Sequence, residues 1–248
     1  LCDTSLGTHS GVYMEIMRGL GDEYIELGQY EEALAIYQEG IIKSMYIREA
    51  VSHDFGNLIM GVQDCYELLG WFNEIPNHLS DAWYFWDKDG TPLVTYTYFP
   101  LWQLEQFYKR YGMYENALSI SRKIEAFITS KGGENHPELA EALYMKGNIL
   151  VEMNRHDDGI KAFQEAIEIL SANGSDNSEL FGLVAGNLFM ALISSEKFEE
   201  SDNVLNRIKN YSISNNTPTY KNALFSAANR VADMRNYAKS LTYNSNLL

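Results

Sequence analysis

The sequence predicts an all-α protein that folds as an α-solenoid of about six helix hairpins. Three observations indicate this fold class. A short turn motif recurs along the chain, apolar residues follow helical spacing on both sides of each turn, and the 248 residues include only five prolines. A stack of hairpins explains all three, because each hairpin contributes one turn flanked by two amphipathic helices.

The recurring turn carries a ring residue at a fixed phase. The ring residues of the six turns are Tyr30, Phe72, Tyr114, His156, Phe198 and Tyr237. The first five follow one another at intervals of 42 residues, and the last interval is 39 residues. Chance rarely repeats a ring residue at one phase five times, so we expect these rings to pack within the repeats.

Apolar residues flank the turns at three- and four-residue spacing. Around the first turn they are Met17, Leu20 and Tyr24, followed by Ala33 and Tyr37. This spacing places them on one stripe of each helix. No linker interrupts the pattern, so the expected organisation is a single array covering residues 1–248. Its repeats are expected near residues 14–47, 56–86, 98–130, 138–171, 178–210 and 219–248.

Small residues stand where the two helices of a pair should cross. These residues are Gly21, Ala33, Ala117 and Gly147. A small side chain at a crossing lets the two backbones approach closely. Gln63 and Glu105 take the place of a small residue in the second and third repeats, which departs from this pattern.

Two segments carry a resemblance to a known family. The first reads Leu20-Gly21-x-x-Tyr24 and continues as Gly28-x-Tyr30-x-x-Ala33, and the second spans residues 133–140, Gly-Glu-Asn-His-Pro-Glu-Leu-Ala. The first resembles the tetratricopeptide-repeat (TPR) family. The 42-residue period and the second segment resemble the TPR subclass of kinesin light chain and bacterial regulators. The resemblance implies a right-handed superhelix whose first helices line a concave face.

A degenerate copy of the inter-repeat segment precedes the first repeat. It reads Leu6-Gly7-Thr8-His9-Ser10, and the first residue of the chain is leucine. We therefore expect the chain to begin in the tail of an earlier unit and to be a fragment of a longer protein.

The composition bounds the kinds of partner. The formal net charge is −15, which argues against binding a nucleic-acid backbone or an anionic membrane surface. The sequence has no uninterrupted run of about 18 apolar residues, the length that a bilayer-spanning helix needs. The two cysteines, Cys2 and Cys65, predict neither a disulfide framework nor a metal site, and we expect Cys65 to be partly buried. They mildly favour the cytoplasm, although an exported sensor domain also fits.

No motif predicts catalysis, a cofactor or a metal. The segment 87–90, Asp-Lys-Asp-Gly, resembles the start of a calcium loop, but the later carboxylates are missing. His136 is expected to close a repeat, and His53 and His78 are expected to be isolated surface residues. Phosphate-cradling glycine loops, dinucleotide fingerprints and nucleophile elbows do not occur.

The concave face implied by the resemblance is the expected binding site. Its side chains are not needed for helix pairing and are free to contact a partner. The candidate partner-binding residues are Trp102, Tyr144, Arg18, Asp22, Glu26, Asp64, Gln106, Lys109 and Asn148. Large rings on a rigid face commonly anchor a partner, so Trp102 and Tyr144 are the expected anchors. The acidic residues favour a basic or amphipathic segment by charge complementarity.

Three functions remain open on this evidence. The leading hypothesis is a non-catalytic scaffold module that binds a protein or peptide segment. The alternative is the sensor or regulatory domain of a bacterial signalling protein with a separate output domain, such as a kinase, cyclase or DNA-binding domain. An enzyme is the third, and no catalytic cluster in the sequence supports it.

Overall fold

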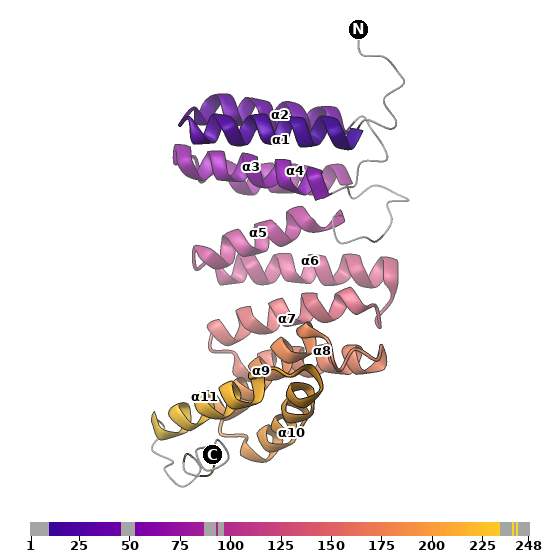
Figure 1. The fold of residues 1–248 in the computed structure, drawn as a ribbon, viewed down its shortest axis with the longest axis vertical. Helices are drawn as coiled ribbons and strands as arrows, with labels where there is room; N and C mark the ends of the chain where they lie inside the picture. Colours follow the sequence, from indigo (N-terminus) through magenta and orange to yellow (C-terminus); the bar gives the residue numbers. More distant parts are fainter. Residues whose placement is uncertain are drawn as a thin grey trace. The chain divides into compact units, whose positions relative to one another are not determined.

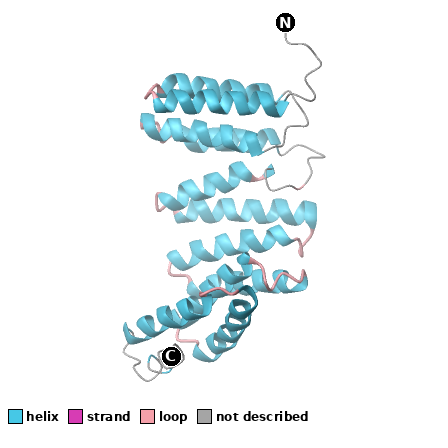
Figure 2. Ribbon diagram, viewed as in Figure 1, coloured by secondary structure: helices cyan, strands magenta, loops and turns pink. Residues whose placement is uncertain are grey.

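A computed structural model describes residues 10–45, 53–86, 93, 97–233, 240 and 242 of the chain. Within these residues the regular structure is α-helical and contains no strand (Figure 2). The helices are α1 (Ser10–Glu26), α2 (Tyr30–Met45), α3 (His53–Leu69), α4 (Glu74–Trp86), α5 (Phe99–Arg110), α6 (Tyr114–Gly132), α7 (Pro137–Glu152), α8 (His156–Ala172), α9 (Glu179–Ser194), α10 (Phe198–Asn215) and α11 (Thr219–Asp233). The predicted fold class is confirmed: the chain is an α-solenoid of helix hairpins.

The chain divides into two compact units, residues 1–111 and residues 112–248. In the first unit, α1 and α2 lie side by side, and α3 packs against both of them (Figure 1). In the second unit, α7 pairs with α8 and α9 with α10, while α8 contacts α9 and α11 contacts both α9 and α10. A single array over residues 1–248 and a right-handed superhelix both stay predictions.

Some expectations fall outside the described residues. The second helix of the sixth hairpin, with the ring of Tyr237, is one of them, and the calcium-like segment 87–90 is another. The inter-repeat segment before the first repeat also lies outside, except for Ser10. The side chain of His53 is likewise not described.

The turns within the hairpins share one backbone conformation. Gly28, Gly70 and Gly112 have φ angles of 71°, 74° and 71°, and the next two turns place Asn154 and Glu196 there, each with a φ of 59°. These five residues also follow one another at 42-residue intervals. A residue in this left-handed region ends a helix by a Schellman motif, and glycine adopts it without a steric penalty. The repeat therefore fixes a turn conformation as well as a ring.

The hydrogen bonds confirm this helix ending. In the first turn, the amide of Gln29 donates to the carbonyl of Tyr24 over 2.9 Å, and the amide of Gly28 donates to the carbonyl of Ile25 over 2.9 Å. In the fifth turn, the amide of Lys197 donates to the carbonyl of Leu192 over the same distance. In these two turns the last carbonyls of the first helix are thus satisfied before the second helix starts.

Close helix crossings occur at the predicted small residues. A Cβ atom on Gly21 would lie 2.4 Å from the ring of Tyr37, and one on Gly147 would lie 2.4 Å from the ring of Phe163. Gly61 repeats this relationship between hairpins, because its Cβ would lie 2.6 Å from the ring of Tyr37. Glycine at these positions lets an aromatic ring of a second helix lie directly on the backbone of a first helix.

Three sequence expectations need correction. The rings of Tyr30, Tyr114, His156 and Phe198 are half-buried, but the ring of Phe72 remains 42% exposed and does not pack like the others. Helix α10 runs to Asn215, past the expected end at 210, because the left-handed residue that ends it is Asn216. Cys65 is fully buried rather than partly buried.

Candidate partner-binding face

Two of the predicted residues on α1 are held in place by each other and by a buried tyrosine. Arg18 Nη1 donates to Asp22 Oδ2 over 2.9 Å, and both side chains are partly exposed. The hydroxyl of Tyr37, whose side chain is buried on α2, donates to Asp22 Oδ1 over 2.6 Å. Asp22 therefore links a second helix to the exposed surface of a first helix. Glu26, one turn further along α1, is exposed.

A second acidic group lies on α3. Glu67 Oε1 accepts hydrogen bonds from Arg110 Nη1 on α5 over 2.8 Å and from Gln63 Nε2 over 3.1 Å. Desolvation raises the pKa of the neighbouring Asp64 carboxyl, the nearby Glu67 carboxylate raises this pKa further, and Arg110 opposes the rise. Asp22 also raises it, which places the acidic groups of α1 and α3 within electrostatic reach of each other.

The acidic group borders a hollow in the surface of the first unit. The hollow has a volume of about 460 Å³ and is open to solvent. It is lined by Ile25, Asp64, Glu67, Leu68, Phe72 and Tyr111. Three of these residues are exposed apolar or aromatic side chains: Leu68 at 49%, and Phe72 and Tyr111 at 42% each. The hollow therefore combines carboxylates with uncovered apolar surface, a combination suited to an amphipathic group.

The predicted residues of α5 share one helical stripe with the ion pair. Trp102, Gln106 and Arg110 follow one another at four-residue separations, and Lys109 follows Gln106 by three residues, so these side chains lie on one side of the helix. Trp102 is half-buried, because its ring lies 5.7 Å from the ring of Phe99. Gln106 is also half-buried, and its Nε2 has no hydrogen-bond partner among the described residues. Since Arg110 reaches Glu67 on α3, this stripe borders the acidic group.

The second unit gathers three polar side chains on its first helices. Asn187 Nδ2 on α9 donates to Asn148 Oδ1 over 2.7 Å and lies 3.4 Å from the hydroxyl oxygen of Tyr144, both on α7. The Tyr144 ring lies 6.2 Å from the ring of Phe163. The two predicted residues of α7 are thus brought together, with Asn187 bridging them.

The structure therefore groups the predicted residues within each unit. Arg18, Asp22 and Asp64 belong to the acidic side of the first unit, and Tyr144 and Asn148 form the polar cluster of the second. We call the solvent-accessible side chains of α1, α3 and α5, with the adjoining turn residues Phe72 and Tyr111, the first-helix face of the first unit, and those of α7 and α9 the first-helix face of the second unit.

Sequence reasoning missed five members of these sites. Ile25, Leu68, Phe72 and Tyr111 line the hollow, and Asn187 bridges the polar cluster. Leu68, Phe72 and Tyr111 lie at or beside the turn motif. The repeat pattern predicts that rings at this motif are buried by packing within the repeat. Their exposure is a tertiary property that the repeat pattern does not carry. Asn187 lies on α9, the first helix of its hairpin, so helical phase could have found it.

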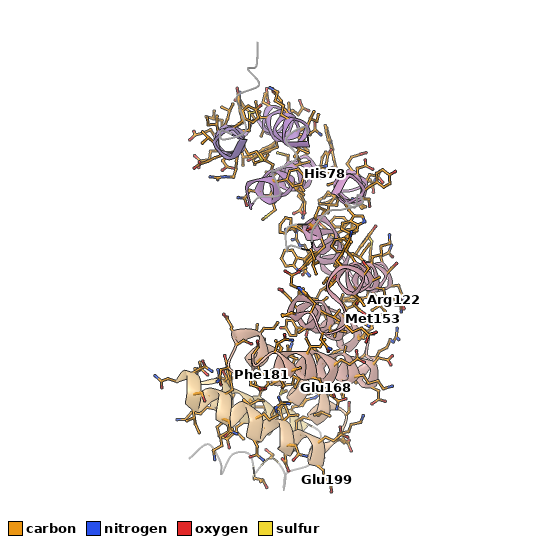
Figure 3. The ribbon with its side chains drawn as sticks, turned by 90° about the vertical axis from the view of Figure 1, so that its right-hand side faces the viewer. His78, Arg122, Met153, Glu168, Phe181 and Glu199 are labelled. Carbon is orange, nitrogen blue, oxygen red and sulfur yellow. The ribbon has the colours of Figure 1, made fainter. Side chains whose placement is uncertain are left out.

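The structure agrees with the expected position of His136 and corrects that of His78. His136 Nδ1 accepts a 3.3 Å hydrogen bond from the amide of Glu138 and caps α7, as expected for a residue that closes a repeat. His78 (labelled in Figure 3) is not the isolated surface residue that was expected. It is half-buried, with its ring edge-on to Tyr66 at 5.9 Å, and burial lowers its pKa to about 4.

Reactive groups are sparse in the described part of the chain. There, no three histidine, cysteine or acidic side chains gather as a metal site would require. Burial raises the pKa of the Cys65 thiol to about 11, so this cysteine is a buried packing residue rather than a nucleophile. None of the described helices combines the length and the apolar character needed to cross a membrane.

Comparisons with known proteins agree with the hairpin stack. A family model described as a tetratricopeptide repeat matches residues 19–41 and 140–171, which belong to the first and fourth repeats. The comparison with curated protein sequences gives no match.

Three solved structures share the fold at low sequence identity. BtubC (BKLC) from P. vanneervenii has a TM-score of 0.65 at 13% identity, with 94% of this chain and 89% of that chain covered. The TPR-like repeats of a putative kinesin light chain from Podosopora anserina have a TM-score of 0.56 at 11% identity, covering 81% and 95%. Aspartyl phosphate phosphatase F from Bacillus subtilis has a TM-score of 0.59 at 11% identity, covering 98% and 71%. Two stretches of the chain, residues 19–41 and 140–171, thus match the tetratricopeptide-repeat model, and the chain as a whole shares the helical-repeat fold of these structures.

Proposed function

We propose that this chain is a non-catalytic module that binds a protein or peptide segment on its first-helix face. The observation that carries the proposal is the hollow of the first unit, where carboxylates of α3 stand beside exposed Leu68, Phe72 and Tyr111. Repeat packing does not require these apolar side chains to be exposed, and contiguous apolar surface rimmed by polar groups is typical of interaction sites.

The proposed anchors are Trp102 in the first unit and Tyr144 in the second. Trp102 is braced by Phe99, and Tyr144 by Phe163 and Asn187, so each ring loses little freedom on binding. Both rings remain partly exposed, which leaves surface for a partner. Rigid aromatic side chains of this kind often contribute much of an interface's binding energy.

A regulatory or sensor role is the second candidate. A Rap protein crystallised with competence and sporulation factor shares the fold, with a TM-score of 0.56 at 11% identity, covering 95% of this chain and 73% of that chain. A fold of this kind can therefore receive a signalling factor. The full-length gene distinguishes the two roles: a kinase, cyclase or DNA-binding domain on the same polypeptide supports the regulatory role.

A peptide selection tests the binding function. A random dodecapeptide library is selected against the whole chain, and the affinity of each selected synthetic peptide is measured by fluorescence anisotropy. Trp102→Ala and Tyr144→Ala should each lower the affinity for peptides that contact the replaced ring. The expected decrease is about fivefold or more, equivalent to about 1 kcal/mol of binding free energy. The controls are Arg122→Ala and Glu168→Ala, at exposed positions on the second helices α6 and α8 (Figure 3).

The controls decide the outcome. Peptides that lose affinity with first-helix variants and keep it with the two controls support the proposal. Peptides that respond only to Arg122→Ala or Glu168→Ala, or a selection that yields no binder, would overturn it.

A further inference from the structure

The hollow of the first unit has an imbalance of charge. Two carboxylates, Asp64 and Glu67, line it, and one cation, Arg110, pairs with Glu67. The carboxylate of Asp64 makes neither a hydrogen bond nor an ion pair with another residue in the described part of the chain. Asp22 adds a further negative charge within electrostatic reach of Asp64. The hollow can therefore accept one more positive charge at Asp64.

The remaining lining limits what kind of cation fits. Ile25, Leu68, Phe72 and Tyr111 are apolar or aromatic, and the rings of Phe72 and Tyr111 meet edge-to-face at 5.7 Å. A small hydrated metal ion gains nothing from such walls and needs more oxygen ligands than two carboxylates supply. Lysine and arginine side chains have an apolar stem and a charged end, which matches apolar walls beside carboxylates. A volume of about 460 Å³ lies within the range of about 300–1,000 Å³ that ligand pockets occupy.

We propose that this hollow receives a lysine or arginine side chain of the partner segment, with its stem against Leu68, Phe72 and Tyr111 and its charge at Asp64. This inference rests on the proposed binding function and specifies its partner as a basic, amphipathic segment. Charge complementarity favours this occupant, because the two carboxyl groups that line the hollow, Asp64 and Glu67, are both acidic.

Arg110 acts as an internal competitor at this site. Its side chain is 54% exposed and its Nη1 reaches Glu67 Oε1 over 2.8 Å, yet Arg110 is not among the residues that line the hollow. It therefore neutralises part of the acidic group without filling the apolar space. Removing its charge makes Glu67 available to the incoming cation and strengthens the local negative potential. Arg110→Gln should accordingly raise the affinity for a basic segment by about threefold, as expected for loss of an exposed ion pair.

The test is a double-mutant cycle on peptides selected from the random dodecapeptide library. Selected sequences should share a lysine or arginine next to an aliphatic or aromatic residue. Asp64→Asn, which keeps the side-chain shape, should lower the affinity for such a peptide by about fivefold or more. The weakening should vanish when the basic residue of the peptide is replaced by methionine, because only then is the pairwise interaction absent.

The matched control is Glu74→Gln, which removes an acid at the other side of the same turn. Glu74 lines a separate hollow of about 630 Å³ with Leu34, Gln38, Tyr66, Gly70, Trp71 and Asn73. This variant should leave the affinity unchanged. Peptides that depend on Trp102 or Tyr144 but bind the Asp64→Asn variant as tightly as the wild type would refute the basic-side-chain site and leave the binding function standing. If no selected peptide loses affinity with any first-helix variant, the binding function itself is refuted.

Discussion

The hydroxyl of Tyr37 donates a 2.6 Å hydrogen bond to Asp22, so a buried ring of α2 orients an exposed carboxylate of α1. The ring of Tyr37 also lies over two glycines, Gly21 of its own hairpin and Gly61 of the next. Desolvation and the Asp22 carboxylate both raise the pKa of Tyr37, so the hydroxyl stays protonated and remains a donor. One residue thus joins two hairpins and fixes part of the proposed binding face.

Replacing Tyr37 by phenylalanine should lower the free energy of unfolding by about 1 kcal/mol. The change keeps the ring packing and removes only the hydrogen bond, whose acceptor Asp22 is 50% exposed and can bind water instead. Urea denaturation followed by circular dichroism measures the effect. Tyr84→Phe is the control, since Tyr84 is 81% exposed and its hydroxyl should contribute nothing measurable. Equal midpoints for the two variants would contradict a stabilising role for the Tyr37–Asp22 bond.

Alanine substitutions at three helical glycines should have opposite effects on stability. Gly21→Ala and Gly61→Ala place a Cβ atom 2.4 Å and 2.6 Å from the Tyr37 ring, which must then move, at a loss of about 1–3 kcal/mol. A Cβ atom on Gly19 meets nothing within 4 Å, so Gly19→Ala should raise stability by up to about 1 kcal/mol through helix propensity. Thermal unfolding of the three variants checks this order. A stabilised Gly61→Ala variant would show that the ring is not packed on the glycine.

Acidification should destabilise the fold through His78. Burial lowers its pKa to about 4, against the opposing effects of Asp81 and of a hydrogen bond with the backbone of Ile59. The unfolded chain binds a proton at His78 below its ordinary pKa of about 6.5, whereas the folded chain does not until about pH 4. The stability contributed by neutral His78 is therefore complete above about pH 6.5 and is lost as the pH falls towards 4.

The loss should reach about 2 kcal/mol at pH 5. Urea unfolding at pH 7.5, 6.5 and 5 measures it, and comparison with His78→Phe isolates the contribution of this one residue. The phenylalanine variant keeps a ring against Tyr66 and has no proton to bind. Parallel stability profiles for the wild type and the variant would exclude His78 as the cause.

Replacing Asn187 by alanine should separate α9 from the polar cluster on α7. Asn187 Nδ2 donates to Asn148 Oδ1 over 2.7 Å, and loss of this partly buried bond should lower stability by about 1 kcal/mol. Asn203→Ala makes the same chemical change at an exposed position of α10 and should be neutral. Backbone amide exchange of α7 and α9 provides a second measurement, because protection should fall in these helices first if the bridge connects them.

The repeat pattern predicted most of the fold. Helices begin and end within a few residues of the expected bounds, because the turn ring and the left-handed residue two positions before it recur every 42 residues. The turn and the two amphipathic stripes are local properties, so they can be read from the order of residues. The close approach at Gly21 and Gly147 also follows from the sequence, since only a small residue permits a ring to lie on the helix backbone.

The candidate site was predictable only in part. Helical phase placed Asp22, Asp64, Tyr144 and Asn148 on first helices, where the structure also has them, and their contact with a partner stays a prediction. It could not indicate that Arg110 of α5 pairs with Glu67 of α3, 43 residues away, or that Asn187 bridges two residues of α7. These contacts depend on how neighbouring helices are rotated and offset, which is set by side-chain packing over the whole hairpin.

The sequence by itself therefore determined the helices, their turns and the apolar stripes that stack them, because all of these follow from residue spacing along the chain. The tertiary structure decided which side chains remain uncovered. Phe72 occupies the same repeat position as the half-buried Tyr30 and Tyr114, yet it remains exposed and lines an acidic hollow with Asp64. Exposure depends on the neighbours that packing brings together, and the residue type at a repeat position does not specify those neighbours.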